Sequence, residues 1–283
     1  QTVMIGWTST NHGANASMQI TPAGALDTQV VRIGLGERST ERRLLPEEAA
    51  IAFEVNGRNY AVMMATPVDL ADFALGFMLA EQIIDAAPDI LELSVRESEH
   101  GWLVGLWLEE DCVRRARQRV RLRTAEGSCG LCGLQSLAQV HRPLPLVDQS
   151  LPIADSALFA ALASLRDHQP LNASTGGFHA AAFCDRQGHI RVLREDVGRH
   201  NALDKLIGAL RSEALSPGEG FFLLTSRCSY ELVEKTAIAG CPLLVTVSTA
   251  TSLAVERAKA CGLTLVALAR SDAMLELSSA GAV

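Results

Sequence analysis

The last third of the chain alternates short apolar segments with helical ones, and this alternation restricts the fold more than any other feature. Strands are predicted at 221–225, 242–247 and 263–268, with helices between them at 230–239 and 252–261. Strands joined by single helices form parallel sheets through right-handed crossovers. Because these strands are apolar throughout, the sheet is expected to be covered on both faces. The pattern predicts an α/β domain built on a mainly parallel sheet.

The preceding residues predict further hairpins and helices. Residues 51–64 have the pattern of a β-hairpin closed by an Asn56-Gly57 turn, and a helical apolar period follows through Ile84. A second hairpin is predicted around Asp185-Arg-Gln-Gly, followed by a helix at 199–211. The first hairpin and its helix indicate a second, smaller unit ahead of the larger α/β domain.

We therefore expect an α/β (α+β) protein with three segments. Residues 1–28, rich in Thr, Asn and Gly, are expected to be a disordered tail. Residues 29–145 are expected to form a smaller N-terminal α+β domain, and residues 146–283 the larger α/β domain.

Composition and charge exclude several classes of function. The formal net charge is −7 and the sequence pI is near 5.5, so bulk electrostatics does not draw the chain to nucleic acid. No apolar stretch reaches the roughly 18 residues of a membrane-spanning helix. The first residues lack the basic and apolar regions of a secretory signal, and an odd number of cysteines, seven, fits a reducing compartment. We expect a cytoplasmic protein without nucleic-acid or membrane partners.

Two cysteines separated by two residues, Cys129 and Cys132, lie in the glycine-rich segment 127–133. The thiolate is the nucleophilic and metal-binding form of cysteine, and nearby positive charge favours it. Arginines occupy every second position from Arg115 to Arg123, just upstream. We interpret this alternation as a strand with one strongly basic face, which is either solvated or visited by an anion.

The cysteine pair fits sulfur chemistry better than a zinc site. Structural zinc normally takes four ligands, but the sequence has no second Cys-x-x-Cys pair and only His179 has a suggestive position. Zinc deaminases place a His-x-Glu motif ahead of their cysteines, whereas His179 follows Cys129 and Cys132. The pair also does not follow the first strand of a short βαβ unit, as a thioredoxin-like motif would. The remaining interpretation is a thiolate that accepts a sulfur atom and passes it on.

Polar loops follow the three strands predicted in the last third. Ligands bind beyond the carboxyl ends of such strands. These loops read Ser226-Arg227-Cys228-Ser229, Ser248-Thr-Ala-Thr-Ser252 and Arg270-Ser271-Asp272. Hydroxyls, helix N-terminal amides and arginines suit phosphate, although serine and threonine are also ordinary helix caps. In the absence of a G-x-G-x-x-G or Walker A motif, we predict an anion or nucleotide pocket that includes Ser226, Arg227 and Ser248.

A second polar group consists of residues 174–179 and the dense charged run 195–205. This run follows a predicted strand and opens a helix, so several of its side chains are expected at the helix N-terminus. His200 is either a functional or a structural histidine. A buried charge network explains the charged members of the run equally well: Asp196, Arg199 and Asp204.

Five separate motifs make the chain similar to a known family. They are Ala65-Thr-Pro-Val-Asp-Leu-Ala-Asp-Phe-Ala-Leu-Gly-Phe, Ser128-Cys-Gly-Leu-Cys-Gly, Thr175-Gly-Gly-Phe-His-Ala-Ala, Arg194-Glu-Asp-Val-Gly-Arg-His-Asn-Ala-Leu-Asp-Lys and Thr251-Ser-Leu-Ala-Val. From about Glu48 to Met274, the chain resembles the FdhD family, the accessory sulfurtransferases required for formate dehydrogenase activity.

The resemblance implies a function and a carrier residue. Family members take sulfur from a cysteine desulfurase as a persulfide and pass it to the molybdenum cofactor, or its tungsten analogue, for formate dehydrogenase. The persulfide-carrying position falls on Cys129, with Cys132 as a helper. The cofactor is handled as cargo in its bis-molybdopterin guanine dinucleotide form, with no metal bound directly by the protein. A cytidine-deaminase-like three-layer domain and a homodimer are also implied.

The resemblance further implies a cofactor-binding segment after the final strand. This segment falls on Leu268, Ala269, Arg270, Ser271, Asp272 and Ala273. The family usually has an aromatic residue near its start and a glycine after the arginine, where this chain has Leu268 and Ser271. Together with the predicted pocket loops and His179, these residues form the expected cofactor site. Two alternatives remain: a cofactor-binding chaperone without sulfur chemistry, and a zinc-dependent hydrolase of deaminase type.

Overall fold

The computed structural model describes residues 21–124, 143–147 and 152–279. The first range contains β1 (Ala25–Gly34), β2 (Glu37–Pro46), β3 (Ala49–Val55), β4 (Arg58–Ala65), α1 (Leu70–Ala80), η1 (Ala87–Asp89), β5 (Ile90–Ser98), β6 (Gly101–Leu108) and α2 (Glu110–Thr124). The last range contains α4 (Asp155–Ser164), η2 (Leu165–His168), α5 (Pro170–Thr175), β7 (His179–Asp185), β8 (Ile190–Asp196), α6 (Arg199–Ser212), η3 (Pro217–Glu219), β9 (Gly220–Leu224), α7 (Tyr230–Ala239), β10 (Leu243–Thr246), α8 (Ser252–Cys261), β11 (Thr264–Ala267) and β12 (Leu275–Ser278).

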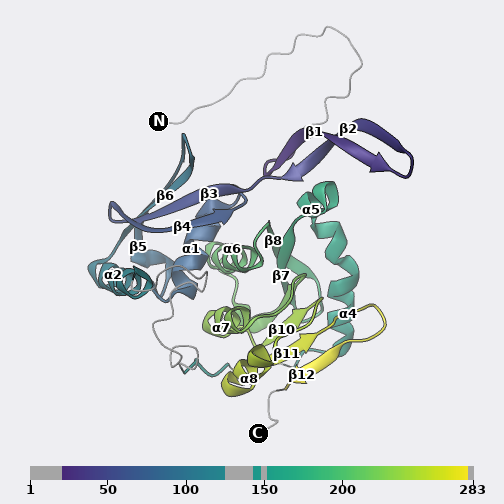
Figure 1. Ribbon diagram of the computed structural model, residues 1–283. Coiled ribbons are helices and arrows are strands. Elements are labelled where there is room, and N and C mark those ends of the chain that lie inside the picture. The colour runs from purple at the N-terminus through teal and green to yellow at the C-terminus, as the bar shows by residue number, and fades with distance from the viewer. Residues whose placement is uncertain (1–20, 125–142, 148–151, 280–283) are drawn as a thin grey trace, which may run out of the picture.

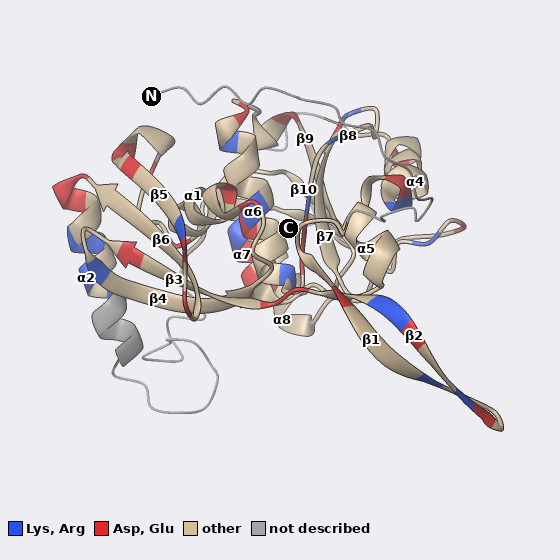
Figure 2. Cartoon of the chain, turned by 90° about the horizontal axis from the view of Figure 1, so that it is seen from above, with Lys and Arg blue, Asp and Glu red and all other residues tan. Residues whose placement is uncertain are grey.

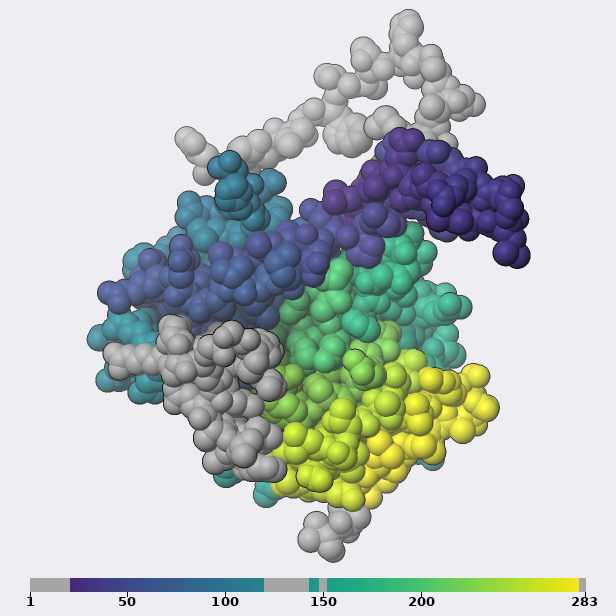
Figure 3. Space-filling model, viewed as in Figure 1, coloured from purple at the N-terminus to yellow at the C-terminus, as the bar shows by residue number. Residues whose placement is uncertain are grey.

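Within these ranges the strands form three sheets (Figure 1). β1 and β2 pair as an antiparallel ribbon that projects from the body (Figure 3). The second sheet has the strand order β4-β3-β6-β5, and the third has the order β12-β11-β10-β9-β7-β8. No helix in the described part of the chain is long and apolar enough to cross a bilayer.

Buried apolar side chains connect the two larger sheets. One cluster extends from the four-stranded sheet through α1 to the helices α6, α7 and α8, and on to one face of the six-stranded sheet. A second cluster fills the opposite face of that sheet beneath α4. The six-stranded sheet is therefore the middle layer between two layers of helices, as its continuously buried strands require.

Two glycines allow α1 and α6 to pack at backbone contact. A Cβ on Gly76 would lie 1.7 Å from the carbonyl oxygen of Asp204, and one on Gly208 would lie 1.9 Å from the carbonyl oxygen of Asp72. No side chain fits at such distances, so glycine is required at both positions. This contact joins the N-terminal elements to the six-stranded sheet.

The prediction of a mainly parallel sheet is wrong. β9, β10 and β11 pair in parallel, as expected from the alternation of strands and helices. However, β7 pairs with β9 in antiparallel orientation, and so do β8 with β7 and β12 with β11. The hairpin of β7 and β8 forms one end of the sheet beside β9, and together with β12 at the other end it makes the sheet mixed.

The prediction that the arginine-rich segment is a strand is also wrong, because it lies in α2. Cys112, Val113 and Ala116 are buried, and their spacing is that of one helix face rather than of a strand. The alternation of arginines does not determine the local structure, because the buried apolar residues follow the helical period.

The predicted elements of the last third are confirmed: α7 and α8 have the expected bounds. β1 begins at Ala25, inside the segment 1–28 that was expected to be a disordered tail, because residues 25–34 pair along their length with β2. The division into domains at residue 145 stays a prediction.

Candidate functional site

The loops that follow β9, β10 and β11 are tied together by backbone hydrogen bonds. The amide of Val247 donates to the carbonyl of Leu224 (2.8 Å), and the amide of Leu268 donates to the carbonyl of Ser248 (3.1 Å). The three loops therefore meet at the carboxyl edge of the parallel strands, as the sequence predicted. At such an edge, ligands of α/β proteins bind.

The first loop presents one free cation. Ser226 is buried, and its hydroxyl donates to the carbonyl of Arg227 (3.0 Å). The Arg227 side chain is exposed and has no hydrogen-bond or ion-pair partner among the described residues. Ser248 of the next loop is half-buried. Arg227 is thus available to an anion at this edge.

The third loop begins with a left-handed residue, Leu268, whose φ is 51°. Ala269 is buried, and the amide of Arg270 donates to the carbonyl of Ala273 (2.9 Å), which closes a tight turn. The Arg270 guanidinium donates to the carbonyls of Val247 and Ala269. In this structure Arg270 therefore braces the loop. Exposed residues follow it: Ser271, Asp272 and Ala273.

His179 lies at the same edge because β7 runs antiparallel to β9 and begins where β9 ends. The neighbouring Ala180 amide donates to the Thr225 hydroxyl (2.9 Å), which anchors this corner. Burial lowers the pKa of His179, and the positive charges of Arg199 and Arg227 lower it further. The imidazole is therefore neutral at neutral pH, in positive surroundings.

Arg199 and His200 open α6 at this edge. The Arg199 Nε is buried and finds no hydrogen-bond partner within the described ranges. Such an unpaired buried donor is costly unless a ligand satisfies it. His200 Nε2 lies 3.0 Å from Glu231 Oε2 and 3.2 Å from Ser229 Oγ, at the start of α7. The contact with His200 is the main cause of a lowered pKa at Glu231.

Arg199 was not among the predicted site residues. For Arg199, as for Asp196 and Asp204, the sequence allowed a buried charge network equally well. Its position directly after a strand and a glycine, at the first turn of a helix, is the signal that points to an anion site.

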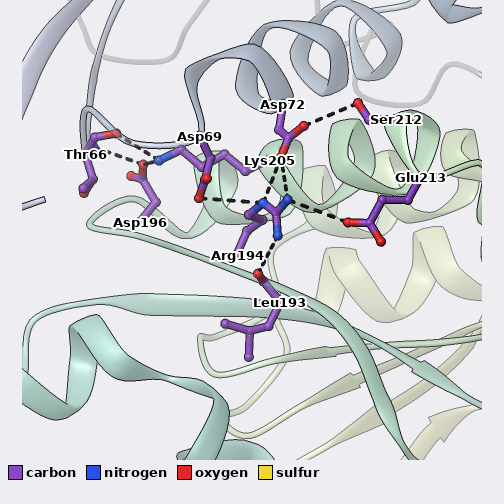
Figure 4. Close-up of polar contacts among 9 residues, drawn as sticks. All are labelled: Thr66, Asp69, Asp72, Leu193, Arg194, Asp196, Lys205, Ser212 and Glu213. Carbon is purple, nitrogen blue, oxygen red and sulfur yellow. Dashed lines mark hydrogen bonds and ion pairs between the residues drawn. The ribbon is translucent and has the colours of Figure 1, made fainter. Parts of the chain in front are cut away.

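Asp196 and Lys205, from the same run, belong to a buried network (Figure 4). Lys205 Nζ lies 2.7 Å from Asp196 Oδ2 and donates to the Thr66 carbonyl (2.9 Å), with both charged side chains fully buried. The amides of Thr66 and Gly198 donate to the Asp196 carboxylate. These contacts hold the β4–α1 connection against the turn that carries Arg199.

Arg194 makes a second link of the same kind (Figure 4). Its guanidinium donates two hydrogen bonds to the Asp72 carboxylate, at 2.7 and 2.9 Å, and lies 3.7 Å from Asp69. Asp204 pairs separately with Lys235 at 2.6 Å. For these charged residues, the network interpretation is the correct one.

Cys129 and Cys132 lie outside the described residues. The five described cysteines are all buried: Cys112, Cys184, Cys228, Cys241 and Cys261. Burial raises the pKa of Cys228 and Cys241 to about 12, and it also raises the pKa of Cys184 and Cys261. These four thiols are thus protonated at neutral pH and are poor nucleophiles. No three His, Cys, Asp or Glu side chains of the described part could together hold a metal ion.

A family model described as the FdhD/NarQ family matches residues 46–282. The chain belongs to the FdhD/NarQ family. The match includes the cysteine pair, the sheet edge and the β8–α6 turn, so all predicted site residues lie within the family's part of the chain.

Curated relatives of the same family cover nearly the whole chain. The sulfur carrier protein FdhD of Xanthomonas oryzae pv. oryzae (strain MAFF 311018) is 41% identical over 257 residues, which are 91% of this chain and 92% of that protein. The sulfur carrier protein FdhD of Xanthomonas euvesicatoria pv. vesicatoria is 42% identical over 90% of each chain. The protein of the same name from Bordetella petrii is 38% identical over 87% of this chain and 89% of its own.

A solved structure shares the fold. The crystal structure of a formate dehydrogenase accessory protein from Desulfotalea psychrophila superimposes with a TM-score of 0.71, covering 91% of this chain and 98% of the other, at 24% identity. At this identity the likeness supports the mixed α/β architecture alone.

Proposed function

We propose that this FdhD/NarQ protein is a sulfurtransferase that carries sulfur on Cys129 to the molybdenum cofactor of formate dehydrogenase. The observation that carries the proposal is the family match over residues 46–282, which includes Cys129, Cys132 and the sheet edge. Relatives named sulfur carrier proteins align over about nine tenths of the chain. The proposal includes a homodimer and a cytidine-deaminase-like larger domain.

In the loading step, the Cys129 thiolate attacks the outer sulfur of a persulfide on a cysteine desulfurase. A new sulfur–sulfur bond forms at Cys129, the bond in the donor persulfide breaks, and the donor cysteine leaves as a thiolate. No net oxidation takes place. Burial raises the pKa of four described cysteines, so these thiols are poor nucleophiles. This supports a carrier cysteine elsewhere in the chain.

In the delivery step, the sulfur must leave at the oxidation level of sulfide, which requires two electrons. Cys129 and Cys132 together can supply these two electrons. The Cys132 thiolate attacks the inner sulfur of the Cys129 persulfide, a Cys129–Cys132 disulfide forms, and hydrosulfide leaves toward the cofactor. A dithiol reductant then restores the two thiols. This step assigns Cys132 its helper role.

The cofactor cargo is proposed to bind at the carboxyl edge of β9, β10 and β11. A guanine dinucleotide carries a pyrophosphate, and the unpaired Arg199 Nε and the exposed Arg227 are the donors that fit it. Backbone amides at the starts of α6, α7 and α8 also point to this edge. The remaining expected contacts are His179, Ser226, Ser248 and the segment 268–273.

Mass spectrometry of the loaded protein tests the carrier role. After incubation with a cysteine desulfurase and L-cysteine, the peptide containing Cys129 is expected to gain the mass of one sulfur atom. Cys129→Ala is expected to lose this gain, whereas the buried-cysteine control Cys261→Ala keeps it. A protein that binds guanosine diphosphate but never gains sulfur would instead be a cofactor-binding chaperone.

A further inference from the structure

α2 concentrates positive charge on an acidic protein. Its 15 residues include six arginines and two acidic residues, whereas the whole chain has a net charge of −7. α2, with its blue segments, lies at the edge of the molecule in Figure 2. Like charges on one helix repel one another, so these arginines destabilise the helix unless opposite charges lie beside them.

Two of the arginines have a structural role. Arg115 donates to the Asp85 carboxylate (2.9 Å), and Arg119 donates to the Glu81 carbonyl (3.2 Å). These contacts fix α2 against the end of α1. They account for half of the arginines whose side chains are described, and they leave the outer side of the helix free.

The other two arginines with described side chains face solvent. The Arg114 side chain is 65% exposed, and its ion pair among the described residues is with Asp111 on its own helix. Arg117 is exposed and has no partner among the described residues. Positions three residues apart are neighbours on a helix surface, so Arg114 and Arg117 form one outward stripe.

We propose that the stripe of Arg114 and Arg117 is a docking surface for an acidic surface of the protein that supplies sulfur to Cys129. This inference rests on the proposed function. Cys129 comes five residues after Thr124, the last residue of α2, and five residues span at most about 18 Å. The chain can therefore bring Cys129 to a donor held on α2. The acidic remainder of the chain repels the acidic surface of the donor protein, and this repulsion directs the donor to α2.

The position of α2 favours a protein partner over the cofactor. Asp85, which Arg115 contacts, lines a cavity of about 170 Å³ together with Arg211 and Ala239, from the C-terminal ends of α6 and α7. The cofactor edge lies at the opposite ends of these helices, at Arg199 and Ser229. A cofactor bound there would not neutralise α2.

The test compares two ways of loading Cys129. One uses a cysteine desulfurase with L-cysteine, and the other uses inorganic polysulfide, which needs no docking. The variant Arg114→Glu/Arg117→Glu is compared with Arg38→Glu/Arg186→Glu, which makes the same charge change at exposed arginines elsewhere. The rate of sulfur gain at Cys129 is followed by mass spectrometry at low and high salt.

The α2 variant is expected to load at least about tenfold more slowly from the desulfurase at low salt. It should load at the unchanged rate from polysulfide, and the control should behave like the unsubstituted chain. Equal desulfurase rates in variant and control would overturn docking on α2, and so would slower loading from polysulfide. Weaker guanosine diphosphate binding with normal loading would assign α2 to the cofactor instead. If neither donor loads the unsubstituted chain, the proposed function itself fails.

Discussion

At the scale of residues, one charged run contains two kinds of side chain. Asp196 and Lys205 form a fully buried pair and Arg194 pairs with Asp72, whereas Arg199 has a buried Nε without a partner in the described part. The sequence predicted both interpretations but could not divide the residues between them. Which side chain meets the β4–α1 connection depends on helix packing, and that is not readable from a local motif.

The Lys205–Asp196 pair is expected to be essential for stability. Lys205→Met removes the cation but leaves a fully buried carboxylate, and breaking such a pair costs about 3–5 kcal/mol. Urea unfolding measures the change. The exposed control Lys259→Met is expected to change stability by less than about 0.5 kcal/mol. Equal stability of the two variants would show that the pair does not brace the β8–α6 turn.

His179 is expected to report on anion binding. Its pKa is lowered by burial and by Arg199 and Arg227, so a bound guanosine diphosphate that neutralises these arginines should raise it. Because protonation of His179 and binding of guanosine diphosphate then favour each other, the affinity for the nucleotide should increase as the pH falls. Calorimetry between pH 8 and pH 5.5 measures this, and His179→Gln should remove that part of the pH dependence.

Two further results check the same site. Arg199→Ala is expected to weaken guanosine diphosphate binding about tenfold or more, because a charge-assisted hydrogen bond is lost, while the exposed Arg186→Ala has no effect. Equal binding of the nucleotide to the neutral and protonated forms of His179 would place the anion elsewhere.

The stability of the protein without nucleotide is a separate check. The pKa of His179 is lower in the folded than in the unfolded chain, so the free energy of unfolding is expected to fall as the pH drops below about 6.5.

At the scale of elements, the sequence was informative where hydrophobic period and chain order agree. α7 and α8 have their predicted bounds because their apolar faces follow the helical period. The strand predicted at α2 is wrong because the arginines alternate while the buried positions Cys112, Val113 and Ala116 have the spacing of a helix. The antiparallel pairing of β7 with β9 is not predictable locally, since a hairpin contains no signal for the strand with which it pairs.

The contact between α1 and α6 gives an element-scale prediction. Alanine normally favours a helix over glycine by about 1 kcal/mol, but on Gly76 a Cβ would lie 1.7 Å from the Asp204 carbonyl oxygen. Gly76→Ala is therefore expected to reduce the free energy of unfolding by at least about 1–3 kcal/mol. Gly218→Ala, where the nearest atom is 3.6 Å away, is the matched control. A stabilised Gly76→Ala variant would contradict the close packing.

At the scale of the whole molecule, two larger sheets share one core, and two charge pairs cross the same junction. The proposed cofactor edge is built on the six-stranded sheet, while α2, which precedes the cysteine pair in sequence, is hydrogen-bonded to the end of α1. The convergence of the three loops was predictable because parallel strands end at one edge. The link between the two halves was not, because it depends on contacts more than 120 residues apart.

The maturation of formate dehydrogenase tests the central claim most directly. Cells that lack this protein are supplied with the unsubstituted chain, Cys129→Ala or the buried-cysteine control Cys261→Ala, and formate oxidation is measured at equal protein levels. The sulfur-carrier account predicts full activity for the first and third and background activity for Cys129→Ala, with its fold and guanosine diphosphate binding unchanged. Normal formate oxidation with Cys129→Ala would contradict the account.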